Sequence, residues 1–256
     1  MRFKLTLQLL PQVKGREIPI NYQYELSSVI YRILSNGNAE YASWLHDNGF
    51  QSENKKVKLF TFSRLIAPYG IDKERARLIL KSNIVEWYIT FLPEKSTQEF
   101  IQGIFKDQQF EIADSISGAA FIVREVQMMP EMNYTSDTVF ETMSPICISQ
   151  KNERGKTDYL APNHPLYTQA ILTGLLARYK ALTGNRFEGE TFCNMEMLTE
   201  PRSALITIKK GTKEETKVRG YLFRFKIELP VELMQIAYEG GIGEKGAQGF
   251  GMIKTI

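Results

Sequence analysis

Residues 240–251 read Gly-Gly-Ile-Gly-Glu-Lys-Gly-Ala-Gln-Gly-Phe-Gly and hold six of the 18 glycines in the chain. Glycine at this density permits positive φ and leaves backbone N–H groups uncovered, which lets a loop approach phosphate groups closely. The segment also fits the dinucleotide fingerprint, but that motif must follow a strand and open a helix. Here it follows a helix expected at 231–238, and little chain remains after it. We therefore expect either a phosphate-binding loop or a plain structural hairpin.

The elements that lead into this segment alternate between strand and helix patterns. Asn163 and Pro165 are suited to open the long helix of this half, and Gly184 is suited to close it. Tyr221 and Phe223 share one face of an alternating run. The expected elements are a strand at 145–149, a helix at 164–182, a hairpin of strands at 203–208 and 218–229, a helix at 231–238 and a strand at 249–255.

The first half of the chain follows the same order. Phe3, Leu5 and Leu7 share one parity, which is the period of a half-buried strand. The expected elements are strands at 3–9, 58–62, 85–91 and 119–128, and helices at 22–34, 39–48 and 97–106. We therefore predict an α+β protein of two tandem ferredoxin-like (RRM-like, βαββαβ) domains with antiparallel sheets, at residues 1–130 and 131–256. Pro130 interrupts the pattern near that boundary.

Composition excludes several classes of protein. The chain has 256 residues with 43% hydrophobic content, enough to build a core, and its net charge of +3 is too small for a polycation. Any basic surface must therefore be local. Two cysteines, Cys147 and Cys193, cannot form a disulfide framework, so we expect a cytoplasmic location. No apolar run approaches the roughly 18 residues that a membrane span needs, and we expect no membrane partner.

Two motifs resemble a known family. Gly241-Ile242-Gly243, five residues and then Gly249-Phe250-Gly251 match the G-h-G-x5-G-h-G signature of the repeat-associated RAMP superfamily. The first half is similar to the CRISPR repeat-processing endoribonucleases of that superfamily. These carry a helical tyrosine, a histidine near the end of the next helix and a lysine that enters a K-L-F-T-[FY]-S motif. The corresponding residues here are Tyr31, His46 and Lys58, the last within Lys-Leu-Phe-Thr-Phe-Ser at 58–63.

The resemblance implies a metal-independent endoribonuclease that cleaves CRISPR precursor RNA within its repeats. A ribose 2′-hydroxyl would attack the neighbouring phosphate and leave a 2′,3′-cyclic phosphate and a 5′-hydroxyl. Tyr31 would help to activate the 2′-hydroxyl and His46 would protonate the leaving group, or the two roles would be exchanged. Lys58 would stabilise the negative charge, although Lys55 and Lys56 in the same loop stay alternatives. The resemblance implies no cofactor.

Helical geometry is compatible with these roles but does not require them. At about 100° per residue, Tyr31 falls on the polar side of its helix, and His46 lies outside the apolar face that Tyr41, Trp44 and Leu45 form. The turn between the two helices would bring both residues to one cleft. Without the motif, a helical tyrosine most often packs, and a histidine near a helix C-terminus also favours the helix dipole.

A basic hairpin is the second candidate for RNA contact. Between 201 and 226 the chain has eight lysines and arginines against Glu214 and Glu215, an excess that suits binding along an RNA backbone. Lysines on an ordinary hairpin edge also prevent aggregation, and that alternative stays open. The predicted RNA contacts are Arg202, Lys209, Arg224, Lys245, Gly241, Gly243, Gly249 and Gly251.

Other activities find less support in the sequence. Two histidines and two cysteines, widely separated, do not make a zinc site, so we predict no metal. A scaffold of the same superfamily that holds guide RNA without cutting it is the main alternative. An enzyme on small nucleotides would need phosphate-binding histidine pairs, which do not occur here. The expected partners are CRISPR repeat RNA, a CRISPR effector complex and, as an open alternative, a second copy of the chain.

Overall fold

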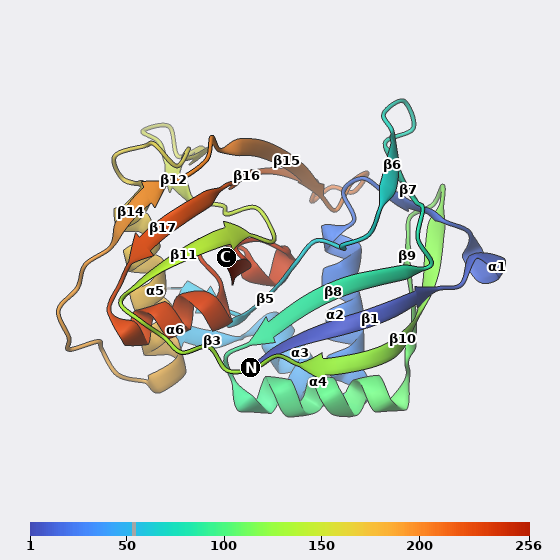
Figure 1. Cartoon of the computed structure of the whole chain (residues 1–256), viewed down its shortest axis with the longest axis horizontal. Helices are drawn as coiled ribbons and strands as arrows, with labels where there is room; N and C mark the ends of the chain where they lie inside the picture. Colours follow the sequence, from blue (N-terminus) through green and yellow to red (C-terminus); the bar gives the residue numbers. More distant parts are fainter. Residues whose placement is uncertain (53–54) are drawn as a thin grey trace.

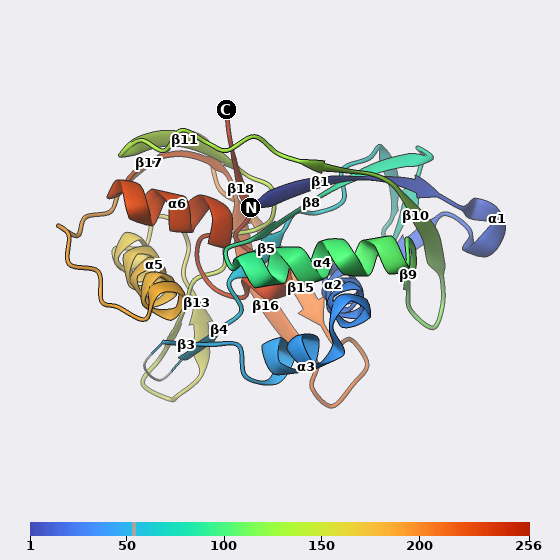
Figure 2. The same ribbon diagram turned by 90° about the horizontal axis from the view of Figure 1, so that it is seen from below.

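The computed structural model describes residues 1–52 and 55–256, and for Lys55 the backbone alone. Its first large sheet has the strand order β5-β8-β1-β10-β9, with every neighbouring pair antiparallel. Helices α2 and α4 lie on one face of this sheet (Figures 1 and 2). The elements are β1 (Arg2–Leu9), α2 (Gln23–Gly37), β5 (Phe60–Phe62), β8 (Ile84–Phe91), α4 (Glu94–Lys106), β9 (Gln109–Ala113) and β10 (Gly118–Met128).

The second large sheet repeats this arrangement. Its order is β14-β17-β11-β18, again antiparallel, and α5 and α6 lie on one face of it (Figure 2). In each sheet the first and third strands of the unit are central and the second and fourth flank them, which is the ferredoxin-like order. The elements are β11 (Asp137–Thr142), α5 (Tyr167–Thr183), β14 (Asn194–Met197), β17 (Arg224–Glu228), α6 (Val231–Gly240) and β18 (Ile253–Thr255). The predicted fold class is confirmed.

The period of two in β1 explains the covered face of the first sheet. Leu5 and Leu7 are buried in one cluster with Leu26 and Ile30 of α2, whereas the polar residues at 4, 6 and 8 of β1 stay half-buried. Each such buried side chain contributes about 1.5–3 kcal/mol. A separate cluster lies between the second sheet and α5 and α6. The division of the chain at residue 130 stays a prediction, although the two sheets draw their strands from 2–128 and 137–255.

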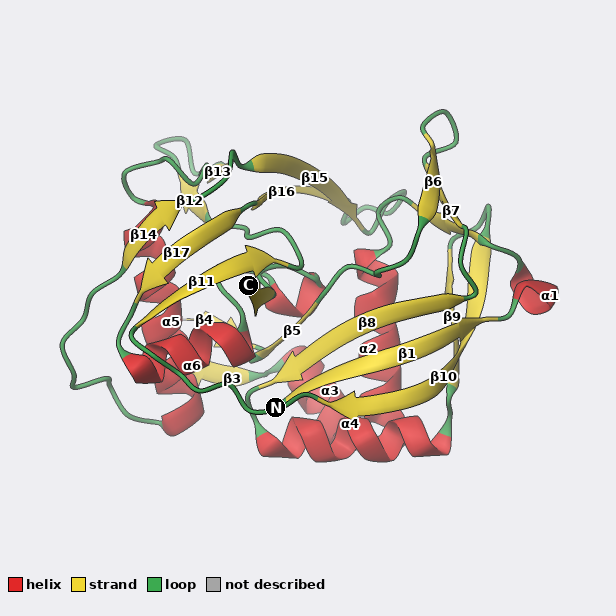
Figure 3. Ribbon diagram, viewed as in Figure 1, coloured by secondary structure: helices red, strands yellow, loops and turns green. Residues whose placement is uncertain are grey.

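Two predictions for the second half are wrong. The segment at 145–149 is not the first strand of the sheet, because β11 holds that place and Ile146 makes only an isolated bridge to Tyr221. The predicted hairpin forms, but its second strand, expected at 218–229, is not one strand. Its first part pairs with 202–208 in a separate ribbon of β15 (Arg202–Ile208) and β16 (Thr216–Leu222), as Figure 3 shows, whereas its later part is β17 of the large sheet. The apolar residues that alternate along this ribbon pack in a small third core instead, in which Ile206 and Val218 lie with Phe250.

The two units also contain smaller helices and strands outside the two large sheets. Helix α3 (Ala39–Asp47) follows α2 directly, and the 3-10 helix η1 (Gly246–Gln248) lies within the glycine-rich segment. No helix within 1–52 and 55–256 is both long and apolar enough to cross a membrane. The remaining elements are α1 (Pro11–Lys14), β2 (Glu17–Pro19), β3 (Phe50–Ser52), β4 (Lys55–Val57), β6 (Tyr69–Asp72), β7 (Arg77–Leu80), β12 (Ser149–Lys151) and β13 (Thr157–Tyr159).

The two units are joined by buried polar contacts from the first sheet. The guanidinium of Arg2 donates to the carbonyl oxygens of Ile253 at 2.8 Å and Tyr238 at 2.7 Å, and it lies 3.6 Å from the centre of the Tyr238 ring. The Thr61 hydroxyl donates to the carbonyl oxygen of Phe250 at 2.7 Å. Burial lowers the pKa of Arg2, and the two carbonyl oxygens satisfy its terminal nitrogens, whereas its buried Nε has no hydrogen-bond partner among the residues that the structure describes. The C-terminal segment is thereby fixed against the first sheet.

Candidate active site

Asn38 sets the angle between the two helices that carry Tyr31 and His46. It ends α2 in an extended conformation and caps α3, because its side-chain oxygen accepts a hydrogen bond from the Tyr41 N–H at 3.0 Å. Helix α3 therefore folds back beside α2, and the rings of Tyr31 and His46 meet edge to face with centres 5.1 Å apart. The structure brings the two predicted residues together.

The environment of Tyr31 differs from the expected one. The ring is half-buried and packs against Phe60 of β5, with ring centres 5.8 Å apart, so it does not lie on a freely exposed polar face. The helical spacing of α2 could not show that Phe60 of β5 packs against this side of the helix. Burial raises the pKa of the Tyr31 phenol well above its ordinary value, and Tyr41 adds a smaller effect in the same direction. At neutral pH the phenol therefore stays protonated.

His46 is the exposed member of the pair. Its side chain is 69% exposed, and its Nδ1 lies 2.9 Å from Oδ1 of Asp47. A carboxylate at Nδ1 orients the imidazole and favours the tautomer with the proton on that nitrogen. The Nε2 atom is then the one suited to exchange a proton with a ligand. Its position in the last turn of α3 agrees with both the catalytic and the helix-dipole interpretations.

Lys58 reaches the C-terminus of α3 from the other side. Its ammonium donates to the carbonyl oxygens of Leu45 and His46, each at 2.5 Å, and Lys56 donates to that of Asp47 at 3.1 Å. Burial, followed by the charge of Lys56, lowers the pKa of Lys58. Of the two lysines whose side chains are described, Lys58 is the one bonded to the backbone of His46. The side chain of Lys55 lies outside the described residues.

Gly49 makes this approach sterically feasible, and the sequence analysis did not identify it. Its φ of +65° ends α3, and a Cβ atom there would lie 2.8 Å from the Val57 carbonyl oxygen and 3.2 Å from Nζ of Lys58. A glycine three residues after a helical histidine was the available signal. Leu59, which follows Lys58, also has a positive φ of 54°. A non-glycine residue in this region marks local strain next to the site.

The glycines of the C-terminal segment have a packing role. Gly241, Gly243, Gly249 and Gly251 are buried with positive φ, and a Cβ atom on Gly251 would lie 2.0 Å from the Ile242 carbonyl oxygen. The expectation of uncovered N–H groups is wrong for two of them. Gly249 donates to the Gly246 carbonyl and Gly251 to the Pro145 carbonyl, each at 2.9 Å. Close approach of backbone segments, which only glycine allows here, explains their density.

The same segment lies beside the Tyr31–His46 pair. The Ser27 hydroxyl, one helical turn before Tyr31, donates to the Ala247 carbonyl oxygen at 2.7 Å. A Cβ atom on Gly246 would lie 2.6 Å from the carbonyl oxygen of Phe60, the residue against which Tyr31 packs. Lys245 is exposed in the left-handed conformation, with a φ of 60°. The loop, α2 and β5 therefore form one surface.

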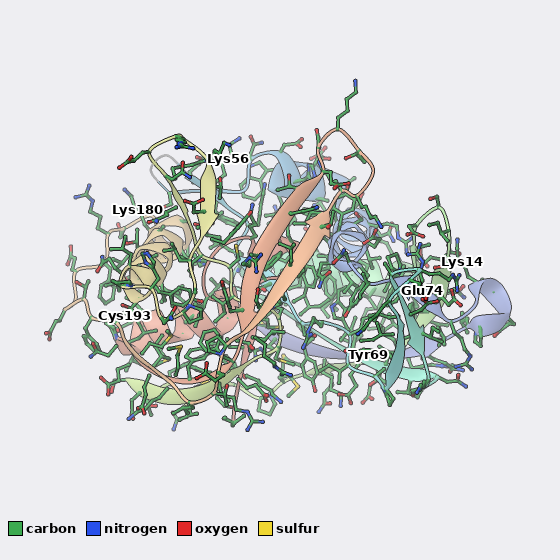
Figure 4. The ribbon with its side chains drawn as sticks, turned by 90° about the horizontal axis from the view of Figure 1, so that it is seen from above. Lys14, Lys56, Tyr69, Glu74, Lys180 and Cys193 are labelled. Carbon is green, nitrogen blue, oxygen red and sulfur yellow. The ribbon has the colours of Figure 1, made fainter. Side chains whose placement is uncertain are left out.

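The basic residues of the ribbon divide into two groups. Arg202 and Arg224 line a cavity of about 290 Å³ together with Arg64, although Arg224 is also paired with Glu141 at 3.3 Å. Figure 4 shows the ribbon crossing the middle of the molecule. Lys209, near its tip, donates to Glu214, and this bond raises the pKa of the lysine. Their contact with RNA stays a prediction.

The other histidine has a structural environment. Nδ1 of His164 accepts a hydrogen bond from the Leu166 N–H at 3.2 Å, just before α5. Among the described residues, no group of three or more histidine, cysteine, aspartate or glutamate side chains is placed to hold a metal ion.

These features define a class of protein: two ferredoxin-like units whose glycine-rich C-terminal segment lies against the helix pair of Tyr31 and His46. Family models described as CRISPR-associated protein Cas6, N-terminal and C-terminal, match residues 17–127 and 127–255. The chain therefore belongs to the Cas6 family of CRISPR-associated proteins.

Individual relatives are similar to this chain over nearly its whole length. An endoribonuclease-like protein Cas6 of Pyrococcus furiosus is 28% identical over 99% of this chain and 98% of its own. The CRISPR-associated endoribonuclease Cas6 of the same organism is 26% identical over 100% of this chain and 90% of its own. A solved structure of a Cas6-related protein from Pyrococcus furiosus matches with a TM-score of 0.84 and 26% identity, covering 100% of this chain and 98% of that one.

Proposed function

We propose that this chain is an endoribonuclease that cleaves CRISPR precursor RNA within its repeats by attack of a ribose 2′-hydroxyl on the neighbouring phosphate. The observation that carries the proposal is the contact between the Tyr31 and His46 rings, with the Lys58 ammonium bonded to the His46 carbonyl oxygen. The relative described as a CRISPR-associated endoribonuclease supports the activity. No step in this proposal uses a cofactor.

His46 is suited to act as the general acid. Its ring is exposed, and the Asp47 carboxylate, 2.9 Å from Nδ1, orients the ring and leaves Nε2 free to face a ligand. In the transition state Nε2 would give its proton to the departing 5′-oxygen. A positioned general acid contributes roughly 10²–10⁴-fold to the rate.

Tyr31 and Lys58 have supporting roles in this mechanism. Because the raised pKa keeps the Tyr31 phenol protonated, it is a poor base and instead serves as a hydrogen-bond donor that orients the 2′-hydroxyl or a phosphate oxygen. The raised pKa of Tyr31 does not choose between the two role assignments, because a protonated phenol can also act as an acid. We assign the acid to His46 because its ring is exposed, and the proton of the attacking 2′-hydroxyl then passes to a solvent water. Lys58 uses two of its three N–H donors on α3, which leaves the third for a phosphate oxygen in the transition state.

RNA would extend from this site along the glycine-rich segment. Lys245 is exposed on that segment, which is fixed to α2 through the Ser27 hydroxyl and therefore lies next to the reacting groups. The arginine-lined cavity at Arg64, Arg202 and Arg224 offers a second place for phosphate groups. A CRISPR effector complex, a homodimer and a cytoplasmic location stay predictions of the sequence.

Cleavage assays in EDTA test the proposal. Repeat RNA is incubated with the wild type, with His46→Ala and with His164→Ala, the matched control in the only other histidine. We expect cleavage by the wild type and His164→Ala, and a loss of about 100-fold or more in His46→Ala with RNA binding retained.

Two results would contradict the proposal. Wild-type protein that binds repeat RNA without cutting it would instead support the non-catalytic scaffold, which is the other function compatible with this fold. Cleavage that EDTA abolishes would rule out the metal-independent mechanism.

A further inference from the structure

An aromatic pocket lies on the side of α3 opposite His46. It is lined by Glu40, Tyr41, Trp44, Phe50, Pro93 and Lys95 and encloses about 390 Å³. Trp44 was expected to be buried with its neighbours on α3, and this expectation is wrong, because its side chain is 38% exposed. Trp44 stands two positions before His46, a rotation of about 200° around the helix.

The rings of this pocket are held rigidly. Trp44 stacks against Tyr41, with ring centres 5.6 Å apart and planes at 29°, and the rings of Trp44 and Phe50 form a T-shaped pair with centres 5.1 Å apart and planes at 87°. Tyr41 is in turn fixed by its hydroxyl, which lies 2.5 Å from Oγ of Ser96. An exposed indole face that is already ordered costs little conformational entropy to bind a flat ligand.

The rim of the pocket carries complementary charge for a nucleotide. The Lys95 ammonium lies 5.1 Å from the centre of the Tyr41 ring, and Lys95 stands in the first turn of α4. That helix begins at Pro93 without a side-chain cap, so its first N–H groups favour a nearby anion. Glu40 offers a carboxylate that can accept from the exocyclic amine of a base.

We propose that this pocket binds an unpaired nucleobase of the RNA engaged at His46, stacked on Trp44, with its phosphate directed toward Lys95 and the start of α4. The inference rests on the proposed function, because the RNA is the same molecule. A helix with its side chains is about 10–12 Å across, so the pocket lies within a short length of RNA from the scissile phosphate. Stacking on aromatic side chains is the usual way that proteins bind single-stranded bases.

Intrinsic fluorescence gives a direct test, because the chain has only two tryptophans and Trp87 is fully buried. The probe is repeat RNA added to His46→Ala protein, with binding followed separately by anisotropy of labelled RNA. We expect RNA to quench the emission of Trp44, and a His46→Ala, Trp44→Phe double variant to bind without quenching. An abasic nucleotide at one position of the RNA should abolish the quenching and so locate the base.

Affinity measurements add an independent arm. Trp44→Ala should weaken RNA binding about tenfold, whereas Trp44→Phe, which keeps a ring, should stay within about threefold of the parent. Tyr69→Ala is the matched control, since Tyr69 is a 44% exposed aromatic residue on β6, far from Lys56 and α3 (Figure 4).

Three results would overturn the inference. Binding by anisotropy with unchanged Trp44 emission would exclude a base in this pocket. A change in emission that depends on protein concentration without RNA would assign the pocket to a second copy of the chain. If anisotropy shows no RNA binding at all, the proposed function is refuted together with this inference. Binding without a change in Trp44 emission refutes this inference alone.

Discussion

Replacing Gly251 by alanine tests whether close backbone packing, and not uncovered N–H groups, explains the glycine-rich segment. A Cβ atom there would lie 2.0 Å from the Ile242 carbonyl oxygen, and the residue has a φ of +80°. Gly184 provides the matched control, because its φ is +76° and a Cβ atom would meet nothing within 4 Å. Both substitutions place an alanine at a positive φ. Only Gly251→Ala also brings a Cβ atom against a carbonyl oxygen.

The expected magnitudes follow from that difference. Left-handed φ costs an alanine roughly 1–2 kcal/mol, which is the whole cost expected for Gly184→Ala. In Gly251→Ala the backbones must also separate by about 1 Å, which strains two hydrogen bonds of 2.9 Å, from Ile242 to Gly251 and from Gly251 to Pro145. Each is worth about 1 kcal/mol net, so with the steric term we expect a loss above about 4 kcal/mol.

Thermal unfolding followed by circular dichroism measures both variants. At about 2–4 °C per kcal/mol, Tm should fall by about 2–8 °C in Gly184→Ala and by more than about 8 °C in Gly251→Ala. Below both transitions, Gly184→Ala should cleave repeat RNA as the wild type does. Equal Tm shifts in the two variants would refute the packing explanation.

Four further substitutions separate the roles of the site residues. Tyr31→Phe should slow cleavage about tenfold. The shape of the pH–rate profile below pH 10 should not change, because burial raises the pKa of the phenol. If the cleavage rate of the wild type rises with pH and that of the variant does not, tyrosinate is the base. Lys58→Ala should slow single-turnover cleavage about 100-fold and Lys56→Ala less than about threefold, and the reverse order would transfer the role to Lys56. Lys245→Ala should leave Tm unchanged and reduce the salt dependence of RNA binding by about one unit of slope, whereas an unchanged slope would remove this lysine from the RNA surface.

The sequence predicted the elements of the first half well because each has a strong period of its own. The alternation of β1 and the apolar stripe of α2 depend only on which side faces the core. The second half was harder, since β15 and β16 alternate as clearly as the strands of the sheet but cover a third core around Phe250. Nothing in a local pattern distinguishes one core from another.

The site shows the same limit. Motif order identified Tyr31, His46 and Lys58, which the structure brings together. The half-burial of Tyr31 depends on β5, which approaches from a distant part of the sequence, and helical spacing cannot reveal such a neighbour. The packing role of Gly251 likewise depends on a carbonyl oxygen across the loop. Residue types and spacing thus predicted which side chains lie together better than they predicted the surroundings of each one.

The proposed role of His46 as the proton donor can be tested with a single altered atom in the RNA. In a repeat RNA whose scissile 5′-oxygen is replaced by sulfur, the leaving group is a thiolate that departs without protonation. If His46 protonates the leaving group, His46→Ala should cleave this RNA at nearly the wild-type rate while remaining about 100-fold or more slower on ordinary RNA. An equal defect on both RNAs would contradict the account.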